Sequence, residues 1–317
     1  MQDGYVLIIG SSNMDLNIYS ERLPNPGETV TGGIFKQFLG GKGANQAVAS
    51  VRSGANTTFI AKIGKDGFGN QMIARFSDEG IDTTHIIRDS QEASGVAFIL
   101  IDENGENMIS VAPGANARLS KMDLEKVSDV IKNAGVIVVQ MEIPIETIEA
   151  IYNIASQGNA IKILNPAPLK PFPTNMLKNI DIIIPNEGEL YRLHSLLNLK
   201  EITGEGREKI INASRNIAAL GLKTIITTLG SKGCLIYEKE HDQALNVPAF
   251  KVKAVDTVGA GDCFNGVLAS KLFQGETLIN AVKYATAAAS IAVTRKGAQE
   301  SMPYEEEIEV RYKELPI

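Results

Sequence analysis

The chain has 317 residues, of which 44% are hydrophobic and 21% charged, and its formal net charge is −6. These values are typical of a globular protein with the size of one large α/β domain. The negative charge and the lack of a basic cluster argue against nucleic-acid binding, and no apolar run approaches the ~18 residues that a membrane span needs.

Two further absences narrow the class of protein. The first ten residues lack a basic region followed by a long apolar one, so we expect no export signal and a cytoplasmic location. The two cysteines, Cys234 and Cys263, belong to no CxxC or Cys/His cluster. The sequence therefore supports neither a disulfide framework nor a zinc site.

Short apolar runs alternate with helical patterns along the chain. The runs typical of buried strands cover residues 5–9, 57–61, 136–140, 161–164, 182–184 and 224–227, and helical patterns between them include 120–132 and 145–155. Such an alternation predicts an α/β fold, a doubly wound and mostly parallel sheet flanked by helices.

Two segments, 16–38 and 94–111, break this alternation. In the second, Asn104-Gly105 joins two extended runs as a hairpin turn would. We expect a small antiparallel sheet of residues 13–38 and 94–111, which projects from an α/β catalytic domain of residues 1–12, 39–93 and 112–317. From the residues alone, the small sheet could cover a site or simply decorate the surface.

A glycine-rich turn, Gly40-Gly41-Lys42-Gly43, leads into a helical segment that stops before Gly54. It is not a Walker A loop, because Lys42 is followed by glycine rather than Ser or Thr. The chain also lacks the GxGxxG dinucleotide fingerprint here and at Gly259 to Gly261.

A second turn, Asp256-Thr257-Val258-Gly259-Ala260-Gly261-Asp262, precedes another helical pattern. The small residues let a phosphate approach the backbone, and the start of a helix supplies free N–H groups and positive potential. Asp262 would lie beside that phosphate, where phosphoryl transfer needs a base. Alone, a Gly-Asp pair is equally consistent with a helix cap.

Polar residues follow the first and third expected strands. Asn13 and Asp15 come after the first, and Glu142 comes after the strand that ends at Gln140. Ligands bind at the carboxyl ends of strands in open α/β sheets, and an uncharged polyol needs fixed carboxylates and amides. Lys42 and Asn45 can join this set, although each residue alone is more often a turn or cap residue.

The chain resembles the ribokinase-like (PfkB) sugar kinases. The motifs GGKGANQA at 40–47 and DTVGAGDCFNG at 256–266 carry the resemblance, and further blocks follow in family order at 10–15, 26–29, 165–168, 185–189, 228–233 and 294–299. These blocks cover nearly the whole length, and together they are far more specific than one glycine motif.

The resemblance implies ATP-dependent phosphorylation of D-ribose at the 5-hydroxyl, with Asp262 as general base. The amides of Gly259, Ala260 and Gly261 would form an anion hole. The family's sugar contacts match, position by position, Asn13, Asp15, Gly41, Lys42, Gly43, Asn45 and Glu142. The glycines fit because a sugar can approach only a backbone that lacks side chains.

The resemblance also implies an ATP site. Its loop would be Thr228-Leu229-Gly230-Ser231-Lys232-Gly233, joined by Asn186, Gly261, Asp262 and Thr286. Thr286 stands where the family often has His or Asn near the adenine. Glu189 would help to place Mg²⁺ through water. Read alone, the loop is a β-turn, and Asn186 with Glu189 is a helix cap with an acidic first turn.

A monovalent cation site, usually for K⁺, is implied by resemblance only. Its matching positions are Asp256, Val258, Ala292, Arg295, Gly297 and Ser301, most of which would act through backbone carbonyls. The resemblance further implies that the small sheet is a lid over the sugar and the surface of a homodimer.

Two alternatives stay open. A relative could phosphorylate another acceptor, such as deoxyribose, fructose or a nucleoside, and a nucleoside would need an apolar platform from Phe35, Phe38 or Phe98. A sugar sensor without catalysis is a different class, against which the intact turn from Gly259 to Asp262 argues.

Overall fold

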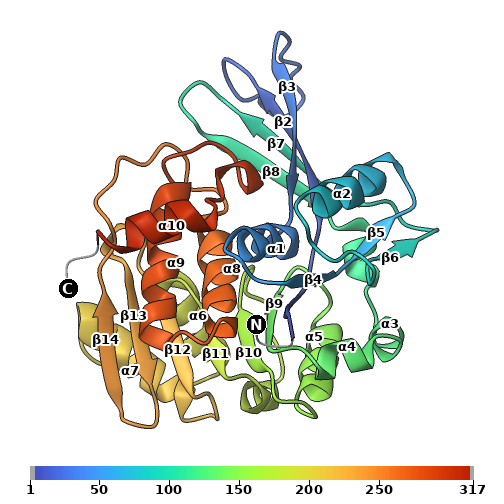
Figure 1. Cartoon of the computed structure of the whole chain (residues 1–317). Helices are drawn as coiled ribbons and strands as arrows, with labels where there is room; N and C mark the ends of the chain where they lie inside the picture. Colours follow the sequence, from blue (N-terminus) through green and yellow to red (C-terminus); the bar gives the residue numbers. More distant parts are fainter. Residues whose placement is uncertain (1–3, 315–317) are drawn as a thin grey trace.

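A central sheet of eight strands forms the body of the protein (Figure 1). The structure is a computed structural model and describes residues 4–314, so the outermost residues of the expected α/β domain, 1–3 and 315–317, lie outside it. The strand order is β14 (Gln243–Val247), β13 (Cys234–Glu238), β12 (Thr224–Thr228), β11 (Ile182–Ile183), β10 (Ile161–Asn165), β9 (Val136–Gln140), β1 (Val6–Ile9) and β4 (Thr57–Ile60).

Pairing from β4 to β12 is parallel, which confirms the doubly wound prediction. The strands β13 and β14 form an antiparallel edge that the sequence analysis did not foresee. The order reverses beside β1, because the chain first places β4 on one side of β1 and later places β9 on the other. A ligand crevice is expected at such a switch point.

Helices cover both faces of the sheet, and alternate residues of β1 show why. Val6 and Ile8 belong to one buried apolar cluster, and Leu7 and Ile9 belong to the other. The first cluster includes side chains of α1 (Lys42–Arg52), α2 (Gly67–Asp78), α8 (Ala260–Phe273), α9 (Leu278–Ala292) and α10 (Glu305–Tyr312). The second includes side chains of α3 (Lys121–Glu125), α4 (Ser128–Lys132), α5 (Ile145–Ala155), α6 (Glu187–Leu196) and α7 (Gly206–Ala218).

The expected helix over 120–132 is two short helices, α3 and α4. Val127 separates them with φ −120° and ψ 20°, outside the helical range. Valine is also a weaker helix former than an unbranched residue, because its β-branched side chain loses χ1 freedom in a helix. Residues 145–155 form the single helix α5, as predicted.

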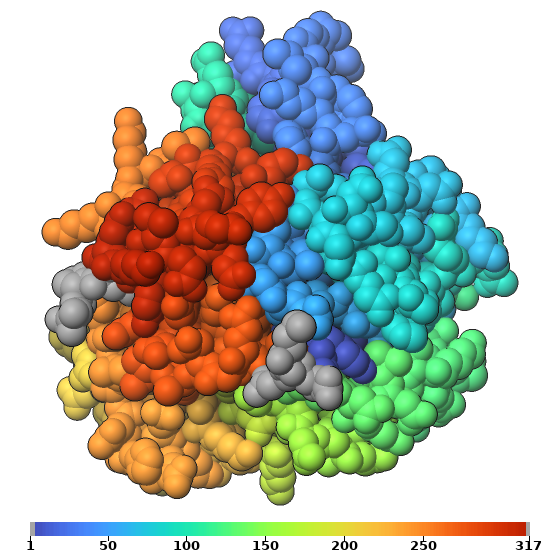
Figure 2. Space-filling view, viewed as in Figure 1, coloured from blue at the N-terminus to red at the C-terminus, as the bar shows by residue number. Residues whose placement is uncertain are grey.

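A second sheet of four strands stands away from the body (Figures 1 and 2). Its order is β3 (Ile34–Gly40), β2 (Asn13–Tyr19), β7 (Gly95–Ile101) and β8 (Asn107–Ala112). The outer pairs are antiparallel as expected, and Gly105, with φ +83°, turns the hairpin between β7 and β8. One detail differs: β2 and β7 are parallel, because both leave the body at the same end, where Asn13 pairs with Gly95.

The remaining pair, β5 (Lys62–Gly64) and β6 (Ile87–Asp89), is parallel and separate from both sheets. Short 3-10 turns occupy Gly114–Arg118, Thr174–Asn179, Gly230–Lys232 and Gln299–Ser301. Within residues 4–314, no helix is both long and apolar enough to cross a membrane.

The helices α1 and α8 pack unusually closely where Gly266 faces α1. A Cβ atom at Gly266 would lie 2.4 Å from the backbone oxygen of Gln46 and 2.7 Å from the Cβ of Ala49. Real Cβ atoms do not approach so near, so a side chain here would push the two helices apart. This contact fixes how far α8 lies from the start of α1.

We predict that Gly266→Ala lowers the free energy of unfolding by about 1–3 kcal/mol, because overpacking forces backbone shifts. Urea denaturation measures the change. Gly67→Ala is the matched control, because a Cβ at Gly67, at the start of α2, meets nothing within 4 Å. Equal stability of the two variants would show that the helix contact can relax.

Candidate active site

The carboxyl ends of the central strands bring the candidate residues together. Asn13 and Asp15 begin β2 just beyond β1, Glu142 follows β9, and α1 begins at Lys42 directly after β3. The N-terminus of α8 closes the site from the side and presents Asp262. The site therefore lies at the switch point between β1 and β9.

The turn before α8 leaves its first N–H groups open. Gly259 is the N-cap, with φ +74° and no side chain to cap the helix, and Ala260 and Gly261 are the first helical residues. The Ala260 N–H donates a long 3.3 Å bond to the Thr257 carbonyl, and Gly261 is exposed. First-turn amides without an intrahelical partner form a natural site for a phosphate.

Asp262 is 6% exposed, and both of its carboxylate oxygens accept hydrogen bonds from α1. Asn45 Nδ2 donates to Oδ2 at 2.9 Å, and Gln46 Nε2 donates to Oδ1 at 3.0 Å. The carboxylate is thus fixed in place next to the open helix terminus. This is the position that a proton acceptor in phosphoryl transfer requires.

The charged groups of the site surround Lys42. Glu142 Oε2 accepts the backbone N–H of Lys42 at 3.0 Å and also the hydroxyl of Ser11. The Asp262 carboxylate, followed by Glu142 and Glu189, raises the pKa of Lys42 and keeps the ammonium charged. The set can donate to and accept from several hydroxyl groups of one ligand.

Asp15 lies beside this cluster on β2. Burial, and then the carboxylates of Glu142, Glu300 and Asp262, raise the pKa of Asp15 to about 7. Next to it in the sheet, Asn13 Oδ1 accepts a 2.8 Å bond from Asn116. Both side chains are therefore held at the base of the small sheet.

The candidate glycines Gly41 and Gly43 have a structural reason in addition to the expected one. Gly41 adopts φ +87°, and a Cβ there would lie 2.8 Å from the backbone of Ser12 and Asn13. A Cβ at Gly43 would lie 2.7 Å from the backbone of Gly10 and Ser11. For the buried Gly43, close packing of α1 on the strand end is therefore a reason for glycine in addition to the expected one.

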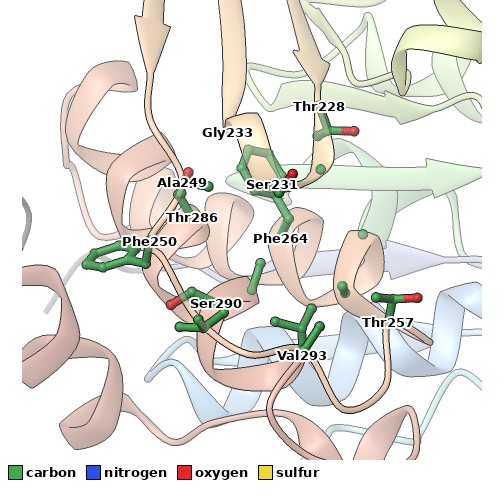
Figure 3. A pocket seen from close by; sticks show the side chains of 16 residues that line it. Thr228, Ser231, Gly233, Ala249, Phe250, Thr257, Phe264, Thr286, Ser290 and Val293 are labelled. Atoms are coloured by element: carbon green, nitrogen blue, oxygen red, sulfur yellow. The ribbon is translucent and has the colours of Figure 1, made fainter.

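A cavity of about 320 Å³ lies on the other side of the α8 terminus (Figure 3). Of the candidate nucleotide residues, it is lined by Thr228, Gly230, Ser231, Gly233, Gly261 and Thr286. The other lining residues are apolar or carry hydroxyl groups, and they include Phe250, Phe264, Ser290 and Val293. Such a lining suits a flat, largely apolar base.

The hydroxyl protons of Thr286 and Ser290 are already used. Thr286 Oγ1 donates to the Val282 carbonyl at 2.8 Å, and Ser290 Oγ donates to the Ala287 carbonyl at 2.7 Å. Both hydroxyls therefore offer lone pairs to a ligand in the cavity. An exocyclic amine is the complementary group.

Four candidate nucleotide residues do not line this cavity, namely Leu229, Lys232, Asn186 and Asp262. Asn186 and Glu189 form a capping box on α6, with Asn186 Oδ1 accepting the Glu189 N–H at 2.8 Å and Glu189 Oε2 accepting the Asn186 N–H at 2.9 Å. Glu189 nevertheless lies near enough to Lys42 for its carboxylate to help raise the pKa of the ammonium. A hydrated Mg²⁺ fits this group, because one carboxylate can hold the ion through water.

The candidate cation residues come from two adjoining loops. The N–H groups of Val255 and Asp256 donate to the Val293 carbonyl, and the Asp256 carboxylate accepts 3.0 Å bonds from the N–H groups of Val258 and Gly297. The Arg295 guanidinium is paired with Glu307, and the Ser301 hydroxyl donates to the Ala298 carbonyl. The Asp256 carboxylate therefore ties the two loops together, and it is the one acidic group of the candidate set. Among residues 4–314, no group of three His, Cys, Asp or Glu side chains could hold a metal.

Several buried amides of the site were missed in the sequence analysis. Gln46, Gln140, Asn165 and Gln299 join Asn45 and Asp262 in one hydrogen-bond network. Gln46 is adjacent to the candidate Asn45, and Gln140 ends a predicted strand. The sequence positions of Gln46 and Gln140 could thus have indicated that these amides belong to the site. Which side chains meet, however, depends on how α8 lies against α1.

Comparisons with known proteins agree with this geometry. The sequence profile of the pfkB family of carbohydrate kinases matches residues 3–305. A ribokinase of Staphylococcus aureus is 39% identical over 96% of this chain and 98% of its own length, and a deoxyribokinase of Salmonella typhi is 36% identical over 94% and 95%. The structure of Arabidopsis thaliana ribokinase complexed with ribose and ATP matches with a TM-score of 0.91 at 29% identity, covering 98% of this chain and 99% of that one.

Asp15 gives a prediction for stability against pH. Burial and the neighbouring carboxylates raise its pKa in the native state to about 7, from an ordinary value of 3.8, so the native state holds an extra proton between these values. The free energy of unfolding therefore falls as pH rises through that range. Asp15→Asn removes this loss of stability, because the amide does not titrate. Urea unfolding measures the free energy of unfolding of the variant minus that of the wild type. This difference should be about 2 kcal/mol larger at pH 8 than at pH 5. Asp129→Asn, at a side chain that is 89% exposed, should show no such trend. A constant difference for Asp15→Asn would contradict the buried, protonated carboxyl.

Proposed function

Because the chain belongs to the pfkB family of carbohydrate kinases, we propose that it transfers the γ-phosphoryl group of ATP to the 5-hydroxyl of D-ribose. The products are ribose 5-phosphate and ADP. One observation carries the proposal: Asp262 lies between a cluster that can read hydroxyl groups and a cavity that fits a nucleotide base. We place the reaction in the cytoplasm, where ATP is available.

In this mechanism the sugar lies at the strand ends, held by Asn13, Asp15, Lys42, Asn45 and Glu142. Asp262 accepts the proton of the 5-hydroxyl as that oxygen bonds to the γ-phosphorus. The bond from the γ-phosphorus to the β–γ bridging oxygen breaks, and ADP leaves. The N–H groups of Gly259, Ala260 and Gly261 stabilise the charge on the moving phosphoryl group.

The base cavity supports ATP as the donor. The lone pairs of Thr286 and Ser290 complement the 6-amino group of adenine, whereas guanine would present a second acceptor there. Thr286 can therefore serve where relatives have His or Asn. The turn from Thr228 to Gly233 would flank the nucleotide, and Asn186 would help to orient its phosphates.

Two ions complete the proposal. Glu189 would hold Mg²⁺ through water, and the ion would neutralise phosphate charge. K⁺ would be held by Asp256 and by carbonyls of the loops that contain Val258, Ala292, Arg295, Gly297 and Ser301. Because Asp256 binds both loops, this region is well placed to support the Gly259 turn.

The small sheet, residues 13–38 and 94–111, is proposed as a lid and dimer surface. Six of its large apolar side chains are more than half exposed, namely Ile34, Phe35, Phe98, Met108, Ile109 and Val111. Such a concentration marks an interaction surface. A monomeric mass in analytical ultracentrifugation at micromolar concentration would contradict the dimer.

The register of the small sheet bears on the acceptor. Phe38 pairs with Asp15 and shares its face, whereas Phe35 and Phe98 pair with Ile18 and Leu16 on the other face. Only one of the three phenylalanines considered as a nucleoside platform therefore faces the sugar cluster. This arrangement favours a small polar sugar over a nucleoside.

The function is tested by ATP-dependent phosphorylation of ribose, deoxyribose, fructose and adenosine with Mg²⁺, in K⁺ and again in tetramethylammonium. We expect ribose to give the highest kcat/KM and K⁺ to raise it. Preference for deoxyribose, fructose or adenosine would overturn the sugar assignment, and tight ribose binding without turnover would indicate a sensor. Equal rates in K⁺ and tetramethylammonium would contradict the proposed K⁺ site.

Asp262→Asn should reduce kcat by about 10²-fold or more, because the amide cannot accept the proton. Isothermal titration calorimetry should show that ribose still binds. Turnover close to that of the wild type would contradict the role of Asp262 as the base.

A further inference from the structure

The side chain of Gln46 is completely buried and joins Asp262 to the central sheet. Its Nε2 donates to Asp262 Oδ1 at 3.0 Å and to Asn165 Oδ1 at 3.2 Å. Its Oε1 accepts a 2.6 Å bond from Gln140 Nε2. All three groups that Gln46 contacts lie at the carboxyl ends of strands or at the start of α8.

The direction of these bonds follows from a backbone group. Asn165 Nδ2 donates at 3.1 Å to the Ile184 carbonyl, which can only accept. Asn165 Oδ1 is therefore the atom that faces Gln46, and it requires a donor. The carboxylate of Asp262 also requires one, so both Nε2 protons of Gln46 are used and its oxygen faces Gln140.

We propose that Gln46 is a positioning residue for Asp262, which orients the carboxylate toward the sugar hydroxyl and keeps it a proton acceptor through the N–H hydrogen bond that Gln46 donates. This inference rests on the proposed function. Donated N–H bonds favour the charged form of a carboxylate, whereas a second carboxyl group at the same distance would share a proton with it.

The other oxygen of Asp262 is held by Asn45, whose Oδ1 accepts a 3.3 Å bond from Gln299. Asn45 is itself a sugar-contact candidate, so a change there would affect binding as well as orientation. Gln46 contacts Asp262 from the sheet side, which makes it the cleaner position for a test.

Other charges also act on Asp262 or on its neighbours. Lys42 on α1 and Asp15 on β2 interact with it electrostatically, Glu142 and Glu189 act on Lys42, and Glu300 acts on Asp15. Arg52 and Arg295 lie on the far side, where they act on Cys263. All of these groups stay in place when only Gln46 is changed.

The test is the pH profile of kcat/KM for ribose in Gln46→Glu. The new carboxyl and Asp262 should share a proton, so the acidic limb should move up by at least one pH unit and activity should recover at alkaline pH. The control is Gln157→Glu, an exposed position after α5 that adds the same charge. A wild-type acidic limb in Gln46→Glu would overturn the proposal.

A second variant, Gln46→Met, keeps the length of the side chain but removes the amide nitrogen and the amide oxygen. Its kcat should fall about tenfold or more, while the Kd for ribose, measured by calorimetry without nucleotide, stays within about threefold of the wild-type value. Wild-type kcat in Gln46→Met would contradict a positioning role, as would a parallel loss of ribose affinity.

An NMR titration of the wild-type protein tests the proposal even if the variants fail to fold. The side-chain NH₂ resonances of Gln46 should follow the titration of Asp262, and a flat response would contradict the contact. The same wild-type preparation is assayed with ribose and ATP. Failure to phosphorylate ribose would overturn the proposed function, whereas the NMR titration reports on the contact between Gln46 and Asp262 independently.

Discussion

The close contact of α1 with α8 is the constraint on which the site depends. Residue 266 must be glycine for the two helices to approach, because a Cβ there would meet the backbone of Gln46. Only at this separation do the short side chains of Asn45 and Gln46 reach the carboxylate of Asp262. One helix carries sugar-contact candidates, and the other carries the proposed base and the proposed phosphate turn. The packing of the two helices therefore brings together the residues to which the proposed reaction assigns roles.

The site contains unfavourable electrostatic interactions, and the rest of the fold offsets their cost in free energy. Asp15 lies buried near three other carboxylates, and this raises its pKa to about 7. Lys42 is placed among carboxylates and stays charged. A bound sugar would offset this cost, because its hydroxyl groups could donate to the carboxylates. The buried carboxylates thus lower the stability of the fold, but the cluster is already arranged to bind a ligand.

The chain sequence predicted the parts of this structure that depend on local pattern. The apolar runs predicted the parallel strands, the Asn104-Gly105 pair predicted the hairpin, and the two glycine turns predicted the helix termini near Asp262. The parallel pairing of β2 with β7 was not predicted, since it depends on where both strands leave the body. Nor was the role of Gln46, whose contact with Asp262 spans 216 residues and exists only because α1 and α8 meet.

The account's central claim is that the protein transfers the γ-phosphoryl group of ATP to the 5-hydroxyl of ribose, and the position of the phosphate on the product reports this most directly. We would incubate the wild-type protein with ATP and uniformly ¹³C-labelled ribose and follow the ³¹P–¹³C couplings of the product by NMR. The account predicts coupling to carbon 5 and release of one ADP per sugar phosphate. Phosphate on carbon 1, or ADP without a sugar phosphate, would contradict it.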